Sequence, residues 1–136
     1  MMCFLFTGCG KEEITEGGTL IYYLNKDATS IVPVDTQITG DGPEIRVEEM
    51  LAKLEETPED LDLRRTIPEN VSVLSYSLDR KQLYLDFSTE YLDMDKATEV
   101  LVRAALVKTM VQVDEISFIG IRVGGEALKD TRGNAI

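Results

Sequence analysis

The chain lacks histidine and tryptophan altogether, and its two cysteines, Cys3 and Cys9, both lie in the opening run. Histidine is the commonest general base and a frequent ligand of transition metals, so its absence removes the most familiar catalytic and metal centres. Without a cysteine after residue 9, the rest of the chain has no thiol nucleophile and no internal disulfide. The sequence therefore predicts no enzyme, no cofactor and no metal site.

Motifs that could replace histidine chemistry are missing as well. The sequence has no Ser-x-x-Lys, no Gly-x-Ser-x-Gly and no glycine-rich phosphate loop. Neighbouring carboxylates such as Glu48/Glu49 and Asp93/Asp95 fall on polar helix faces or in loops, whereas a catalytic pair needs one cleft. We interpret these acids as turn, cap and solubility residues.

Positive charge is also scarce, with 14 Lys and Arg residues against 25 Asp and Glu residues and a formal net charge of −11. Such a surface repels nucleic acid, so we expect no nucleic-acid partner. The length of 136 residues predicts one domain with a core of its own.

The opening run MMCFLFTGCG has no charged side chain and is shorter than the roughly 20 residues that span a bilayer. Its segment Leu5-Phe6-Thr7-Gly8-Cys9 resembles a bacterial lipobox, which implies lipidation of Cys9 and attachment to a membrane. We expect residues 1–9 to be a truncated lipoprotein signal, 10–18 a polar tether and 19–136 a single domain. The alternative is a frayed apolar terminus with two incidental cysteines. The abrupt end of the polar tail leaves a C-terminal truncation open.

Alternating and helical patterns divide the folded part. β-branched and aromatic residues around a turn at 25–28 predict a hairpin, in which Pro33 favours an edge strand. A helix follows Pro43, and a polar connector over 58–70 is expected to bury Leu61 and Leu63. A second hairpin follows, and a strand over 115–123 closes the pattern. The first helix is expected to bury Ile45, Met50, Leu51 and Leu54.

A long helix over 94–113, with Asp95 as its N-cap, carries two apolar stripes. We take the main stripe as core: Ala97, Val100, Leu101, Ala104, Val107 and Val111. The second stripe is a candidate partner surface, unless it packs on the first helix and the connector: Val102, Leu106, Met110 and Val113.

The order of these elements predicts an α+β fold. A β-hairpin precedes an α-β-β-α-β unit, with two helices on one face of a small, mostly antiparallel sheet.

Three blocks in this order resemble the GerM domain of bacterial sporulation and spore-germination lipoproteins. They are Ile67-Pro68-Glu69-Asn70, the strand LYLDFSTEY at 83–91, and ALVKTMVQVDEISFIGIRVGG at 105–125. Lys108 departs from the pattern, since a small or amide residue is expected before Thr109. The resemblance implies a fold similar to the ring-building motif of secretion-system rings, and it carries no catalytic residues.

The resemblance also implies a lipoprotein on the outer face of the cell membrane of a Gram-positive or related bacterium. Its expected function is non-enzymatic assembly at the cell envelope, with other envelope proteins or with itself. The alternative is a surface lipoprotein that binds peptidoglycan or another ligand. A pocket lined by Tyr22, Tyr84 or Tyr91 would favour this alternative.

Overall fold

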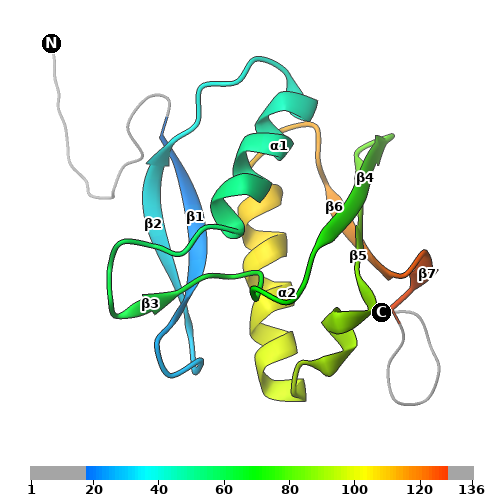
Figure 1. Cartoon of the computed structure of the whole chain (residues 1–136). Helices are drawn as coiled ribbons and strands as arrows, with labels where there is room; N and C mark the ends of the chain where they lie inside the picture. Colours follow the sequence, from blue (N-terminus) through cyan, green and yellow to red (C-terminus); the bar gives the residue numbers. More distant parts are fainter. Residues whose placement is uncertain (1–17, 129–136) are drawn as a thin grey trace, which may run out of the picture.

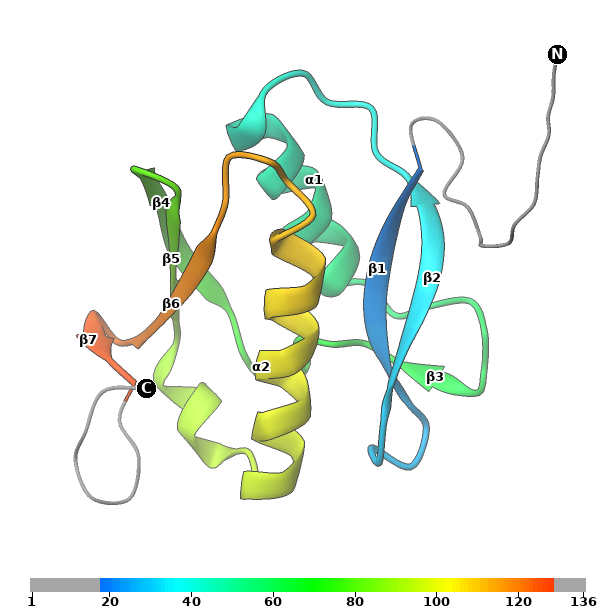
Figure 2. The ribbon, with the colours of Figure 1, turned by 180° about the vertical axis from the view of Figure 1, so that it is seen from behind.

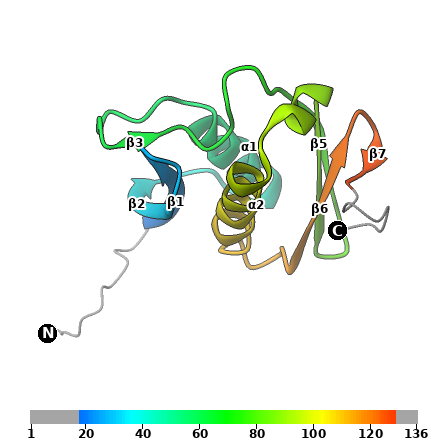
Figure 3. The ribbon, with the colours of Figure 1, turned by 90° about the horizontal axis from the view of Figure 1, so that it is seen from below.

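The computed structural model describes residues 18–128, in which two sheets enclose a layer of two helices (Figure 1). The first sheet is antiparallel in the order β2-β1-β3, with β1 at Gly18–Asn25, β2 at Ile31–Gln37 and β3 at Leu63–Arg64. Seen along the layers in Figure 3, the helices lie between this sheet and a second sheet. The first hairpin therefore forms a layer of its own.

The second sheet has the order β4-β5-β6-β7, with β4 at Val73–Asp79, β5 at Gln82–Phe87, β6 at Phe118–Val123 and β7 at Glu126–Ala127. The pair β5–β6 is parallel because a helix connects the two strands, and the other pairs are antiparallel. The predicted α+β fold, with two helices on one face of a mostly antiparallel sheet, is confirmed.

Helix α1 (Pro43–Leu54) begins with proline and buries Val47, Met50, Leu51 and Leu54. The prediction that Ile45 belongs to this buried stripe was wrong, since its side chain is 51% exposed. A short 3₁₀ helix at Thr89–Asp93 leads into α2 (Lys96–Met110), whose N-cap position is occupied by Asp95 as predicted.

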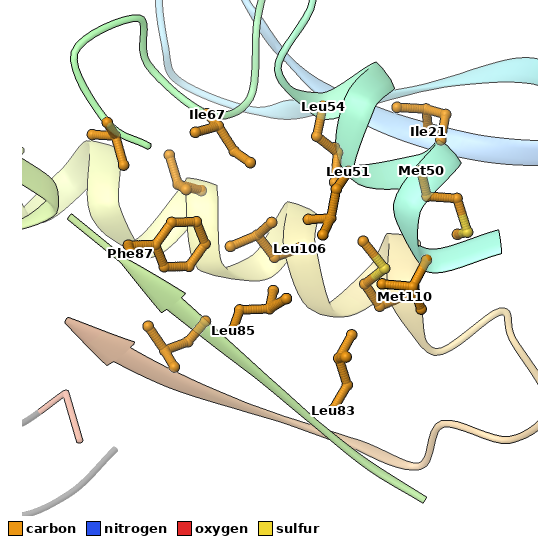
Figure 4. Close-up of a cluster of buried hydrophobic side chains, with 14 of the residues drawn as sticks. Ile21, Met50, Leu51, Leu54, Ile67, Leu83, Leu85, Phe87, Leu106 and Met110 are labelled. Carbon is orange, nitrogen blue, oxygen red and sulfur yellow. The ribbon is translucent and has the colours of Figure 1, made fainter. Parts of the chain in front are cut away.

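The core fills the space between the helices and the second sheet (Figure 4). Leu83, Leu85 and Phe87 alternate along β5 and are fully buried, as the sequence pattern predicts. They meet Leu106 and Met110 of α2 from the opposite side.

The connector between α1 and β4 was predicted only in part. Its Leu61 was expected inside but is 91% exposed, whereas Leu63 is half-buried in β3 and pairs with Asn25 of β1. The buried residues of this segment are Thr66, Ile67 and Val71. Because β3 has only two residues, it shows no alternation of apolar and polar residues, and the sequence could not predict it.

The long flank of β1 beyond β3 is closed by side chains instead of a strand. The Gln112 amide accepts a hydrogen bond from the Leu20 N–H at 2.9 Å and donates one to the Leu20 carbonyl at 2.6 Å. The Tyr22 N–H donates to Thr109 Oγ1 at 3.2 Å, and Thr66 Oγ1 donates to the Tyr22 carbonyl at 2.7 Å. These contacts pin the first sheet to α2 and to the connector.

Candidate interaction surface

The outward face of α2 differs from the one that we expected. The stripe Val102, Leu106, Met110 and Val113, our candidate partner surface, is buried along its whole length. The helix turns this stripe toward α1 and the second sheet, where Leu106 and Met110 contact the core (Figure 4). That surface assignment was wrong, and the packing alternative is correct.

The main stripe of α2, expected in the core, supplies the exposed apolar residues. Val100 is 54% exposed, Val107 is 37% exposed, and Ala104 between them is half-buried. Figure 2, which views the molecule from behind, shows α2 in front with β6 beside it. A helix that covers a core with one stripe and presents a second apolar stripe is typical of a protein that packs on a partner.

An open groove of about 590 Å³ runs between α2 and β6. Its floor is apolar, from Val100, Ala104 and Val107 of the helix and Ile119 and Ile121 of the strand. Because β6 points its odd-numbered residues toward the helices, Ile119 and Ile121 lie on the groove side of the sheet. The groove is thus built from rigid secondary structure.

Two cations, Arg103 and Lys108, border this groove. The Arg103 Nε lies 3.0 Å from Oε2 of Glu99, which also accepts a hydrogen bond of 2.7 Å from the Tyr91 hydroxyl. The Lys108 Nζ lies 5.7 Å from the ring centroid of Tyr22. Lys108 is exposed, which explains how a long cationic side chain fits where the family resemblance led us to expect a small or amide residue.

Charge is divided unevenly between the two helices. In α2, Lys96, Arg103 and Lys108 outnumber the single acid Glu99. In α1 and the loops beside it, Arg46 and Lys53 oppose a much larger acidic set: Asp41, Glu44, Glu48, Glu49, Glu55, Glu56, Glu59, Asp60 and Asp62. The α1 segment with its loops is therefore strongly acidic, whereas α2 has a net positive charge.

Among the described residues, the tyrosines considered for a ligand platform do not share a groove. Tyr91 is buried, and burial with the bond to Glu99 raises its pKa. Tyr84 lies on the outer face of the second sheet, where Arg122 Cζ is 4.7 Å from its ring centroid. Two further grooves lie beside the connector, and both are lined by Thr57 and Leu63. Tyr22, Tyr84 and Tyr91 line neither of these grooves nor the α2–β6 groove.

Other chemical features of the described part are few. Between residues 18 and 128 no three His, Cys, Asp or Glu side chains form a cluster that could hold a metal ion. In the same range, no helix combines the length and the hydropathy needed to cross a membrane. Cys9, the predicted lipidation site, lies outside the described residues.

The residues that sequence reasoning undervalued are Thr109 and Gln112. Thr109 was noted only as part of the family block, yet its buried hydroxyl receives the Tyr22 N–H. Gln112 is a polar residue between the apolar Val111 and Val113 near the end of a helix. That placement could have indicated a structural hydrogen-bonding role.

Comparison with known proteins identifies the family. Residues 20–129 match the family model described as Germane: Sporulation and spore germination. The structure is similar to the first GerMN domain of the sporulation protein GerM from Bacillus subtilis, with a TM-score of 0.69 and 18% identity over 88% of this chain and 92% of that chain. No curated protein sequence matches the chain.

Two further structures share the fold. The tandem GerMN domains of the same Bacillus subtilis protein match with a TM-score of 0.68 and 19% identity over 88% of this chain and 44% of that chain. This chain thus spans less than half of the tandem structure. A crystal structure of a candidate lipoprotein from Clostridium perfringens matches with a TM-score of 0.57 and 19% identity, over 89% of this chain and 85% of that chain.

At these identities the structural matches show the fold, and the family model, which covers most of the chain, supplies the relationship. The resemblance to GerM domains noted in the sequence is confirmed. The chain belongs to the Germane family of sporulation and spore germination.

Proposed function

We propose that this domain is a non-enzymatic assembly module of the bacterial cell envelope that acts in sporulation or spore germination. Membership of the Germane family supports the biological setting. The lack of histidine in the whole chain, and of cysteine after residue 9, supports a role without catalysis.

In this proposal Cys9 carries a lipid that holds the domain on the outer face of the cell membrane. The lipobox-like segment ending at Cys9 supports this, as does the similarity to a candidate lipoprotein from Clostridium perfringens. One acyl chain binds a membrane only marginally, so a durable anchor needs more than one. Replacing Cys9 by serine should move the protein from the membrane fraction to the soluble fraction of a Gram-positive host, and retention in the membrane would contradict the anchor.

The observation that carries the assembly role is the apolar α2–β6 groove with its basic border. We assign it to the acidic α1 side of a second copy. In Figure 1 α1 faces the reader, and in Figure 2, from behind, α2 does, so the two surfaces point in opposite directions. Exposed Ile45 on α1 offers an apolar contact among carboxylates. Opposite charges on opposite sides suit head-to-tail contact, which generates rings or filaments.

Light scattering coupled to size-exclusion chromatography tests this docking. The sample is the full chain with Cys3→Ser and Cys9→Ser, so that no disulfide links copies. We expect mass to grow beyond a dimer with concentration and to fall with added salt, because salt screens the opposing charges. Val107→Asp should abolish this growth, since it places a charge on the groove floor.

A matched control is Leu61→Asp, which changes an apolar residue that is 91% exposed on the connector and should leave the mass profile unaltered. A monomer at every concentration would refute the proposal that a second copy occupies the groove. The partner of the groove would then be a different envelope protein. Growth beyond a dimer that persists in Val107→Asp would refute the groove itself.

A further inference from the structure

A second interaction surface follows from the strand edges. Strands at sheet edges carry unpaired N–H and C=O groups that recruit other strands unless they are protected. In the described structure the edge strands are β2 and β3 of the first sheet and β4 and β7 of the second. Of these, only β2 and β4 are long, with seven residues each.

Most of these edges carry a recognisable protection. β2 contains Pro33, which has no N–H to offer, and the exposed acid Asp35. β3 and β7 have two residues each, too few to template a partner. The flank of β1 that β3 leaves uncovered is closed by Gln112 and Thr109.

β4 is different. From Val73 to Leu78 it has no charged residue and no proline, and its one irregularity is a bulge between Val73 and Ser75. Its inner side chains Val73, Tyr76 and Leu78 pack against the core, and the Tyr76 hydroxyl donates a hydrogen bond of 2.7 Å to Glu48 of α1. The outer side chains Ser75 and Ser77 are small and exposed. Among the described residues no strand pairs with the edge between these two faces.

The hairpin turn indicates which groups of β4 point outward. Two residues, Arg80 and Lys81, join β4 to β5 with φ angles of 53° and 71°, the geometry of a type I′ turn. In such a hairpin the flanking residues Asp79 and Gln82 bond to each other, and the bonding residues then alternate along the strand. The main-chain groups of Tyr76 and Leu78 are therefore directed to the open edge.

We propose that β4 pairs antiparallel with β4 of a second copy about a two-fold axis, which joins the two four-stranded sheets into one. Charge complementarity favours a second copy as the occupant. Glu69 precedes the strand, and at its other end Arg80 and Lys81 outnumber Asp79, so the antiparallel arrangement brings ends of opposite net charge together. Leu74, which is 56% exposed at the bulge, lies where the second strand would cover it.

This contact should respond to salt in the opposite sense to the groove. Two copies with a net charge of −11 each repel one another, while the pairing strands carry a single charged residue each, Asp79 at the C-terminal end. Added salt screens the repulsion and should strengthen the β4 dimer. It should weaken the groove contact, which depends on opposite charges. The two-fold dimer also closes on itself, whereas groove contacts propagate.

A charge-swap experiment tests the pairing by sedimentation velocity. The background is the full chain with Cys3→Ser, Cys9→Ser and Val107→Asp, so that neither disulfides nor the groove contribute. One variant adds Ser75→Lys and Ser77→Lys, and the other adds Ser75→Glu and Ser77→Glu. Across an antiparallel pair these side chains share one face, so like charges oppose each other in either homodimer.

We expect the background protein to form a dimer that tightens with salt. Each variant alone should dimerise about tenfold or more weakly, and an equal mixture should restore the dimer. A background protein that stays monomeric at all salt concentrations would overturn the proposal, as would a mixture that dimerises no better than its components. Far-ultraviolet circular dichroism checks that both variants fold. Because Val107→Asp is present throughout, the result is independent of the function proposed for the groove.

Discussion

Gln112 joins the end of α2 to the first strand of the chain, and its removal should weaken the domain measurably. Its side-chain amide makes two hydrogen bonds to Leu20, at 2.9 Å and 2.6 Å, across 92 positions of sequence. Gln112→Met keeps the length of the side chain and removes both bonds, together with a third that Nε2 donates to the Thr109 carbonyl at 2.9 Å. The comparison therefore isolates hydrogen bonding from packing.

The magnitude follows from the three lost bonds, two to Leu20 and one to the Thr109 carbonyl. A typical intramolecular hydrogen bond contributes about 1 kcal/mol net, and a buried group left without a partner costs about 1–3 kcal/mol. Leu20 is only half-buried, so water can reach part of the vacated site. We therefore expect the free energy of unfolding to fall by about 2 kcal/mol, and the midpoint temperature by about 10 °C.

Urea unfolding followed by circular dichroism measures this loss. The midpoint should fall while the slope with denaturant is unchanged, because the extent of surface exposed on unfolding is unaltered. The matched control is Gln37→Met, which changes an exposed glutamine of β2 and should stay within about 0.5 kcal/mol of the parent. A loss below about 0.5 kcal/mol for Gln112→Met would refute the reasoning that this amide replaces a neighbouring strand.

Three further predictions concern other parts of the fold. A Cβ at Gly120 would lie 2.6 Å from Cδ1 of Tyr84, so Gly120→Ala should displace the ring and cost about 1–3 kcal/mol in urea unfolding, and an unchanged midpoint would contradict that contact. Leu106→Ala should cost about 2–5 kcal/mol because the side chain is fully buried, whereas Val107→Ala on the groove side should cost much less; equal losses would contradict the orientation of α2. The raised pKa of Tyr91 disfavours the phenolate in the folded state, so the stability it contributes is complete below the ordinary value of 10.0 and is lost as pH rises above it. Tyr91→Phe should make the free energy of unfolding fall less steeply above about pH 10, and an identical alkaline decline in the two proteins would argue against the shift.

The sequence correctly predicted the elements in which the residue pattern allows only one buried face or one position in the sheet. In β5 the alternation of Leu83, Leu85 and Phe87 defines an inner face without ambiguity, and all three are buried. Pro33 indicated an edge strand for a similar reason, since proline cannot donate to a neighbour on both sides. In these places local chemistry and the fold agree.

The sequence did not predict which stripe of α2 faces outward, because both stripes are apolar. The choice depends on the first hairpin, which forms a separate sheet on the far side of the helices and fixes their rotation. The same limit applies to Leu61, whose exposure depends on how the connector reaches β3. A periodic pattern shows which faces of one helix or strand are apolar. It does not show which distant segment packs on each face, so the sequence could not predict those contacts.

The closure of β1 by Gln112 and Thr109 has a consequence for the order in which the chain folds. A chain that leaves a ribosome or a membrane channel from its N-terminus presents β1 long before these two residues emerge. Until they do, the first hairpin lacks the partners of its inner flank and cannot reach its final state. Formation of the first layer is thus delayed until most of the chain is available, and a fragment that ends before Gln112 should not hold the native hairpin. The long sequence separation makes the two halves of the domain fold together.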